Sequence, residues 1–230
     1  NFTRPTGETP ALLSFDETTT LFHEFGHALH RIFADGPYDR TSGNVQRDFV
    51  ELPSQVMEHW AAEAEVMKVY AKHYKTGEAI PDELIAKIEK SRQFNQGFET
   101  VEYLAASLLD MDWHTPANPV VDDVRAFEKA SMDKVGLIDE IIPRYRSPYF
   151  QHSFSGGYSA GYYVYIWAEV LDSDAFNAFK ESGDLFNPEL AARFRDLLTN
   201  CGTDEGMAIY TKFRGKEPEI APLLKNRGLQ

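Results

Sequence analysis

Apolar residues recur at helical spacing along most of this chain. Between Leu21 and Phe33 they cluster on one side of a helix drawn at about 100° per residue. The residues Thr18 to Thr20 offer caps at the start of this segment, and Gly36-Pro37 stops it. The pattern therefore predicts an amphipathic helix over 21–33, with its apolar face packed against the rest of the protein.

Further helical patterns follow, separated by glycine or proline. One covers about 50–74, with Pro53 tolerable only in the first turn. The next covers about 81–112, is interrupted only by Gly97, and predicts a long buried helix. An irregular stretch at 137–157 follows. The remaining helices are expected over 122–135, 158–182, 188–200, 203–213 and 217–226.

The chain shows no convincing strand, no internal repeat and no linker rich in Gly or Ser. Its 230 residues, 43% of them hydrophobic, are enough to build a substantial core. We therefore predict an all-α fold, organised as one domain over 1–230.

Charge and cysteine content narrow the classes of partner. Lys and Arg total 23 and Asp and Glu total 36, so the formal charge of −13 repels nucleic-acid phosphates and anionic lipid surfaces. No apolar stretch approaches the roughly 20 residues that span a bilayer. Nucleic acid and membrane partners are not expected. The single cysteine, Cys201, is interpreted as a packed structural thiol.

The first residues, Asn1 to Pro5, resemble neither a native N-terminus nor a signal peptide. We therefore expect a piece of a longer protein, with any targeting information outside it, and a cytoplasmic location.

The segment with the strongest chemical signal is His23-Glu24-Phe25-Gly26-His27, an H-E-x-x-H sequence inside the first predicted helix. Histidines four residues apart share one helix face, so both imidazoles can reach a single zinc ion, and Glu24 can reach a water bound to that ion. The alternative is a purely structural role, in which the two histidines are hydrogen-bonded and bind no metal.

A zinc site of this kind needs a third protein ligand. A metzincin would have Gly at position 30 and His at position 33, where this chain has His30 and Phe33, so that class is excluded. Glu51, on the following predicted helix, is the candidate. Glu58 lies one heptad later and is a candidate to orient a ligand imidazole. His30 is expected to line the site without binding the metal.

These motifs resemble the thimet oligopeptidase and oligopeptidase A family of zinc metallopeptidases, family M3. The resemblance rests on the H-E-x-x-H segment, on Asp48 to Gln55, and on His152 to Trp167, and it covers essentially the whole chain. Pro143 to Ser147 and Asn226 to Leu229 are most similar to its bacterial peptidyl-dipeptidase members.

The resemblance implies roles for individual residues. The zinc ligands would be His23, His27 and Glu51, with Glu24 as general base and proton shuttle. His152, Tyr158 and Tyr165 would contact the substrate or its tetrahedral intermediate. Tyr158, Tyr162 and Tyr165 would also share one side of a helix, which predicts a stripe of phenol donors.

The implied reaction is hydrolysis of peptide bonds in short peptides by a zinc-activated water, with release of C-terminal dipeptides. Arg144 and Arg146 are candidates, by charge alone, to bind the free carboxylate of the substrate; the alternative is a structural ion pair. Cobalt or manganese can replace zinc in such a site.

Two other interpretations remain open. The same zinc site would serve an oligopeptidase that cleaves within short peptides. Alternatively, the chain alone is an inert zinc-binding or peptide-binding scaffold, because the resemblance implies a missing N-terminal half that helps to enclose the substrate.

Overall fold

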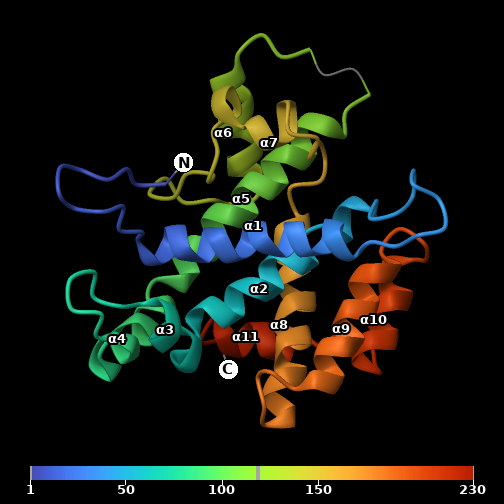
Figure 1. Cartoon of the computed structure of the whole chain (residues 1–230). Coiled ribbons are helices and arrows are strands. Elements are labelled where there is room, and N and C mark those ends of the chain that lie inside the picture. Colours follow the sequence, from blue (N-terminus) through green and yellow to red (C-terminus); the bar gives the residue numbers. More distant parts are fainter. Residues whose placement is uncertain (1, 118–119, 230) are drawn as a thin grey trace. The chain divides into compact units, whose positions relative to one another are not determined.

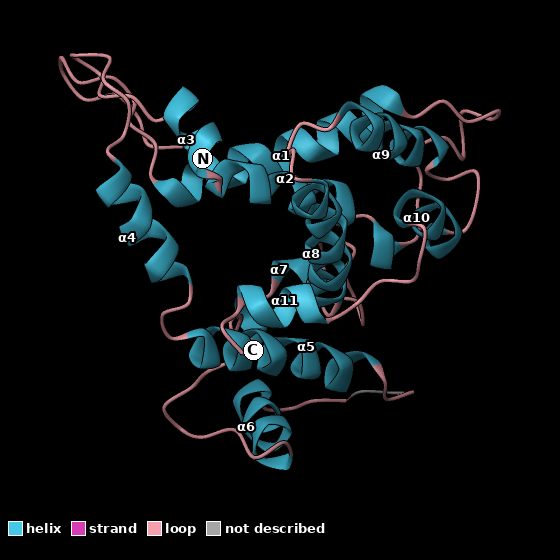
Figure 2. Cartoon of the chain, turned by 90° about the horizontal axis from the view of Figure 1, so that it is seen from below, coloured by secondary structure: helices cyan, strands magenta, loops and turns pink. Residues whose placement is uncertain are grey.

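A computed structural model of the chain describes residues 2–117 and 120–229, and its regular secondary structure is helical (Figure 1). Within these residues the only β-type pairings are isolated bridges, and no strand is drawn in Figure 2. This confirms the all-α prediction. The α-helices are α1 (Phe15–Phe33), α2 (Leu52–Ala62), α3 (Ala64–Tyr70), α4 (Asp82–Arg92), α5 (Gln96–His114), α6 (Val124–Lys134), α7 (Gln151–Phe154), α8 (Val164–Ser182), α9 (Pro188–Asn200), α10 (Gly206–Arg214) and α11 (Ala221–Asn226).

The chain divides into two compact units. The first unit comprises Asn1–Gln93 with Ala168–Gln230, and the second comprises Phe94–Trp167. Helix α8 begins in the second unit and continues through the first. A single catalytic domain over 1–230 stays a prediction.

Helix α1 starts six residues before the predicted position. The Ser14 hydroxyl accepts from the Glu17 amide, and the Glu17 carboxylate accepts from the Ser14 amide, which is a complete capping box. The predicted caps, Thr18 to Thr20, lie inside the helix, where their hydroxyls donate to the carbonyls of 14–16. The predicted start was wrong because the Ser14–Glu17 capping box lies before the apolar pattern that begins at Leu21.

The apolar face of α1 is also not buried as predicted. Phe25 is 52% exposed and Ile32 is 70% exposed, as is much of Leu21. Helix α1 packs against α2 (Figure 1), and its buried residues are Gly26 and His30.

Two predicted helices are broken. The segment 50–74 forms α2 and α3 with an extended residue, Glu63, between them, and Pro53 does stand in the first turn of α2. The segment 81–112 forms α4 and α5, separated at Asn95, whose φ of 59° is left-handed. The "long buried helix" was therefore wrong in length. It was also wrong in burial, because Phe94 is 77% exposed and Ile85 is the only buried residue of α4.

The helix predicted over 158–182 begins only at Val164. Ala160, with a φ of 51°, interrupts any helix before that point. The helices predicted after residue 188 form with shifted bounds, as α9, α10 and α11.

A single apolar core holds the first unit together. Most of its residues come from α2, α8, α9 and α10, and Leu52 of α2 and Leu171 of α8 are fully buried in it. Cys201 is buried in this core and burial raises the pKa of its thiol to about 12, which fits a packed, unreactive cysteine. This core fixes the N-terminal end of α2, where Glu51 lies.

Candidate metal centre

Three side chains of the first unit converge on one point. His23 and His27 lie one turn apart on α1, and Glu51 occupies the N-cap position of α2 without a capping hydrogen bond from its side chain. The Glu51 Oε2 atom lies 3.4 Å from His23 Nε2 and 3.3 Å from His27 Nε2. The three residues predicted as metal ligands are thus brought together, and they form a group able to hold a metal ion.

The separations fit tetrahedral zinc. With zinc-to-ligand bonds of 2.0 to 2.1 Å, two ligand atoms of a tetrahedron stand about 3.3 Å apart. Both histidine-to-glutamate distances match this value. Two imidazoles and one carboxylate are also the donor set of catalytic zinc sites, which keep the fourth position open.

The surroundings of Glu51 support the same interpretation. Its side chain is only 2% exposed, and a carboxylate so deeply buried needs compensating partners. The Ser54 hydroxyl donates to Glu51 Oε2 at 2.9 Å and also to the Glu51 carbonyl at 2.8 Å. Ser54 therefore fixes the carboxylate with the same oxygen turned toward both histidines.

The close approach of α1 to α2 depends on Gly26, between the two histidines. A Cβ atom at this position would lie 2.2 Å from the Pro53 carbonyl oxygen and 2.6 Å from the Ser54 Cα. Only glycine allows the two backbones to meet here. Neither the packing role of Gly26 nor the hydrogen bond of Ser54 to Glu51 was predicted from the sequence. A glycine inside a helical pattern was the available signal for the role of Gly26.

His23 has a second carboxylate partner, Glu58, which accepts from its Nδ1 atom at 2.6 Å. Burial lowers the pKa of His23, but the hydrogen bonds to Glu51 and Glu58 outweigh this effect and raise it to about 9. The two carboxylates thus favour positive charge at this point, which a metal ion bound to the Nε2 atom would supply. The Glu58 contact at Nδ1 leaves Nε2 turned toward Glu51, and the role of Glu58 in orienting a metal-bound imidazole stays a prediction.

The neighbouring α1 side chains differ in their surroundings. Glu24 is exposed to solvent beside His23. His30 is 3% exposed, and burial, with the nearby charge of Arg31, lowers its pKa to about 4. His30 is therefore neutral, and the group of three converging side chains does not include it.

The second unit gathers the other predicted site residues into an aromatic cluster. The ring of Tyr165 lies 5.4 Å from that of Tyr158 and 5.4 Å from that of Tyr162. The ring of His152 lies 5.5 to 6.1 Å from all three. Only Tyr165 stands on α8, so the predicted helical stripe was wrong, although the three phenols do meet.

The two arginines are placed differently. Arg146 forms an ion pair with the buried Glu128, whose second oxygen accepts from the Ser147 amide at 2.7 Å. Arg144 is exposed and its guanidinium lies 5.8 Å from the ring centre of Tyr145. Arg144 is therefore the more accessible of the two.

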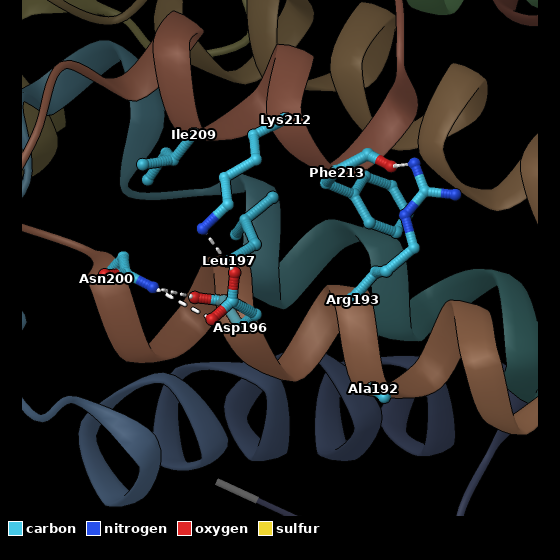
Figure 3. A pocket seen from close by; sticks show the side chains of 8 residues that line it. All are labelled: Ala192, Arg193, Asp196, Leu197, Asn200, Ile209, Lys212 and Phe213. Carbon is cyan, nitrogen blue, oxygen red and sulfur yellow. Dashed lines mark hydrogen bonds and ion pairs between the residues drawn. The ribbon is translucent and has the colours of Figure 1, made fainter.

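A shallow cavity of about 270 Å³ lies elsewhere in the first unit, between α9 and α10 (Figure 3). Its polar groups are paired with one another: Lys212 contacts Asp196 at 2.8 Å, and Arg193 donates to the Phe213 carbonyl. None of the predicted site residues lines it.

Comparison with known proteins assigns a family to this arrangement. The sequence model of Peptidase family M3 matches residues 1–229. The chain is 46% identical to a dipeptidyl carboxypeptidase of Escherichia coli, and 37% and 38% identical to the oligopeptidases A of Haemophilus influenzae and Escherichia coli. Each match covers the whole chain but 34% of the relative, so the chain spans about a third of their length. In the part of the chain that the structure describes, no helix is long and apolar enough to cross a membrane.

Proposed function

Because the chain belongs to peptidase family M3, we propose that it carries the catalytic centre of a zinc peptidase that removes C-terminal dipeptides from short peptides. The observation that carries this proposal is the convergence of His23, His27 and the buried Glu51 at distances that fit one tetrahedral metal ion.

In this proposal His23, His27 and Glu51 would hold a zinc ion. Bound zinc supplies a Lewis acid and lowers the pKa of water toward 7. Glu24 accepts the proton of the attacking water and passes it to the leaving amine, which its exposed carboxylate beside His23 allows. Glu58 keeps the His23 ring oriented by accepting from Nδ1. No covalent intermediate with the protein is needed.

We assign the phenols of the second unit to the substrate. Tyr165, with Tyr158 and His152, donates hydrogen bonds to the oxyanion that develops at the scissile carbonyl. Tyr162 lines the same cluster, and burial raises its pKa, so its hydroxyl keeps its proton at neutral pH.

The exact position of cleavage separates two related functions. Release of C-terminal dipeptides requires a group that binds the substrate carboxylate. The exposed Arg144, whose partners include the phenols of Tyr145 and Tyr162, suits this role better than Arg146, whose charge is already paired with the Glu128 carboxylate. The higher identity to the relative named dipeptidyl carboxypeptidase also favours this function. Cleavage within oligopeptides, the activity named in the oligopeptidases A, is the alternative.

Activity is proposed for a protein longer than this chain. The relatives are about three times as long, and the apolar side chains of Phe25 and Ile32 on α1 are exposed here. We propose that additional chain covers this face and helps to enclose the peptide. The alternative is a chain that binds zinc or peptide but does not turn over alone. A cytoplasmic location stays a prediction.

Product mass spectrometry tests the proposal. An N-acetylated pentapeptide with a free C-terminus is incubated with the zinc-loaded protein and with its Glu24→Gln variant. The expected result is release of the C-terminal dipeptide, lost in the variant. Cleavage at an internal bond would support the oligopeptidase instead. Absence of cleavage by both this chain and a longer protein that contains it would overturn the enzymatic proposal.

A further inference from the structure

The loop that carries two of the clustered tyrosines is held in an unusual conformation. This tyrosine loop, residues 158–163, follows the Gly156-Gly157 pair and precedes α8. Within it Ala160 has a φ of 51°, which residues with a side chain rarely adopt. Such a conformation persists only where surrounding groups enforce it.

Asp110, on α5, supplies the enforcing group. Its side chain is 1% exposed. One carboxylate oxygen accepts from the Ala160 amide at 3.1 Å, and the other accepts from the Tyr162 amide at 2.9 Å. Hydrogen bonds to an ionised acceptor are stronger than neutral ones. The carboxylate therefore binds the backbone of the loop on both sides of Gly161.

His114 and Tyr103 complete this arrangement on the same helix. His114 lies one turn after Asp110, and its Nδ1 atom is 2.9 Å from an Asp110 carboxylate oxygen. Tyr103 lies two turns before Asp110. Its hydroxyl donates to the Tyr162 carbonyl and accepts from the Ile166 amide at 3.3 Å. Helix α5 thus holds both the loop and the first turn of α8.

The held backbone determines where the phenols lie. Tyr162 is itself bound through both its amide and its carbonyl, and its ring lies 5.4 Å from that of Tyr165. A shift of the loop would therefore move Tyr158 and Tyr162 directly and Tyr165 through its ring contacts. Asp110 is buried, so it acts through the loop rather than on the substrate.

We propose that Asp110, assisted by Tyr103, is a positioning residue that holds the tyrosine loop in the arrangement that binds the peptide and its tetrahedral intermediate. The loop-holding part stands on the contacts above, and the catalytic part rests on the proposed function.

The first test measures amide exchange and does not need activity. Asp110→Asn keeps the shape of the side chain but removes the charge and turns one acceptor into a donor. Exchange of the Ala160 and Tyr162 amides, followed by NMR, should accelerate on the order of 10- to 100-fold, as expected for the loss of hydrogen bonds to a charged group. The control is Asp112→Asn, because Asp112 stands on the same helix but contacts Ser131 and Lys134 instead. Its loop exchange should match the wild type.

The second test is a double-mutant cycle in the longer, active protein. Asp110→Asn should lower kcat on the order of 100-fold with a small change in KM, because misplaced phenols fail mainly in the transition state. In a Tyr158→Phe background the same substitution should cost about 10-fold or less, since the hydroxyl that the loop itself presents to the substrate is already gone.

The outcomes of the two tests distinguish the loop-holding role of Asp110 from its effect on catalysis. Unchanged loop exchange in Asp110→Asn would overturn the proposal. Equal losses of kcat in both backgrounds would overturn its catalytic part, because a general loss of structure is independent of the Tyr158 hydroxyl. Faster exchange together with no peptide cleavage by either this chain or the longer protein would uphold the loop contacts and refute the proposed function. If Asp110→Asn does not fold, Tyr103→Phe, which removes one hydroxyl, repeats both measurements from the opposite end of the loop.

Discussion

Replacing Gly26 by alanine tests the geometry of the metal centre with a single methyl group. Gly26 lies between His23 and His27, on the side of α1 that meets α2. The added carbon would stand 2.2 Å from the Pro53 carbonyl oxygen, whereas ordinary contact begins at 3.4 Å. The two helices must therefore separate by about 1.2 Å at this point, because both obstructing groups, Pro53 and Ser54, are backbone.

That separation is large compared with what a zinc site tolerates. Ligand distances in such sites hold within about 0.2 Å, and the two histidines move with α1 while Glu51 stays with α2. Losing one hydrogen-bond partner of a metal ligand weakens metal binding by up to about 100-fold. Because Gly26→Ala displaces the ligands themselves, we expect it to weaken zinc binding by more than about 100-fold. Overpacking should also lower the free energy of unfolding by about 1 to 3 kcal/mol.

The assay is competition for zinc against a chromophoric chelator, with urea unfolding of the metal-free chain in parallel. The matched control is Gly97→Ala on α5, where a Cβ meets nothing within 4 Å. The control should keep wild-type zinc affinity and gain stability, by about 0.4 to 1 kcal/mol. Wild-type zinc affinity in Gly26→Ala would refute the view that backbone contact between α1 and α2 sets the ligand positions.

Three further predictions concern single side chains. Glu58→Gln should weaken zinc binding by about 10- to 100-fold in the chelator assay, because the His23 imidazole loses a charged partner; an affinity equal to wild type would contradict this role. Burial lowers the pKa of His30 to about 4 from 6.5, so the stability that this neutral ring contributes is present above pH 6.5 and is lost as the pH falls toward 4. Between pH 7 and pH 5, the free energy of unfolding of the His30→Gln variant should therefore fall by about 2 kcal/mol less than that of the wild type, measured by urea unfolding with chelator present. Identical pH profiles of the two proteins would contradict the assignment of a buried, neutral His30. Tyr165→Phe should lower kcat by about 100- to 1000-fold at unchanged zinc content, measured by peptide hydrolysis in the longer protein, and an unchanged kcat would remove Tyr165 from the reaction.

The convergence of His23, His27 and Glu51 could be predicted from sequence because local geometry determines most of it. Two histidines four residues apart share a helix face whatever surrounds them. Glu51 was predicted from its place on the next helix and from the resemblance, and the fold brings it to them. What determines its exact position, the contact of Gly26 with Pro53 and the hydroxyl of Ser54, depends on tertiary packing that periodicity does not report.

The errors in the fold have the same origin. Aromatic residues at 158–163 have helical spacing, yet hydrogen bonds from Asp110 hold this stretch as a loop. Apolar spacing also continues across Asn95, where the backbone turns left-handed and the helix ends. On α1, periodicity identified the apolar face correctly but did not reveal that Phe25 stays exposed. The periodicity of apolar residues indicates which side chains share a helix face, whereas long-range contacts determine which face the rest of the protein covers.

The most direct measurement of the central claim is zinc binding by this chain, with stoichiometry and ligand type read together. Titration should give one zinc per chain, and X-ray absorption at the zinc edge should show two imidazole ligands and oxygen at about 2.0 to 2.1 Å. Glu51→Ala should abolish the tight binding, while Asp112→Asn should leave it intact. A wild-type chain that binds no zinc, or a Glu51→Ala variant that binds it equally well, would contradict the assignment of His23, His27 and Glu51 as the metal centre.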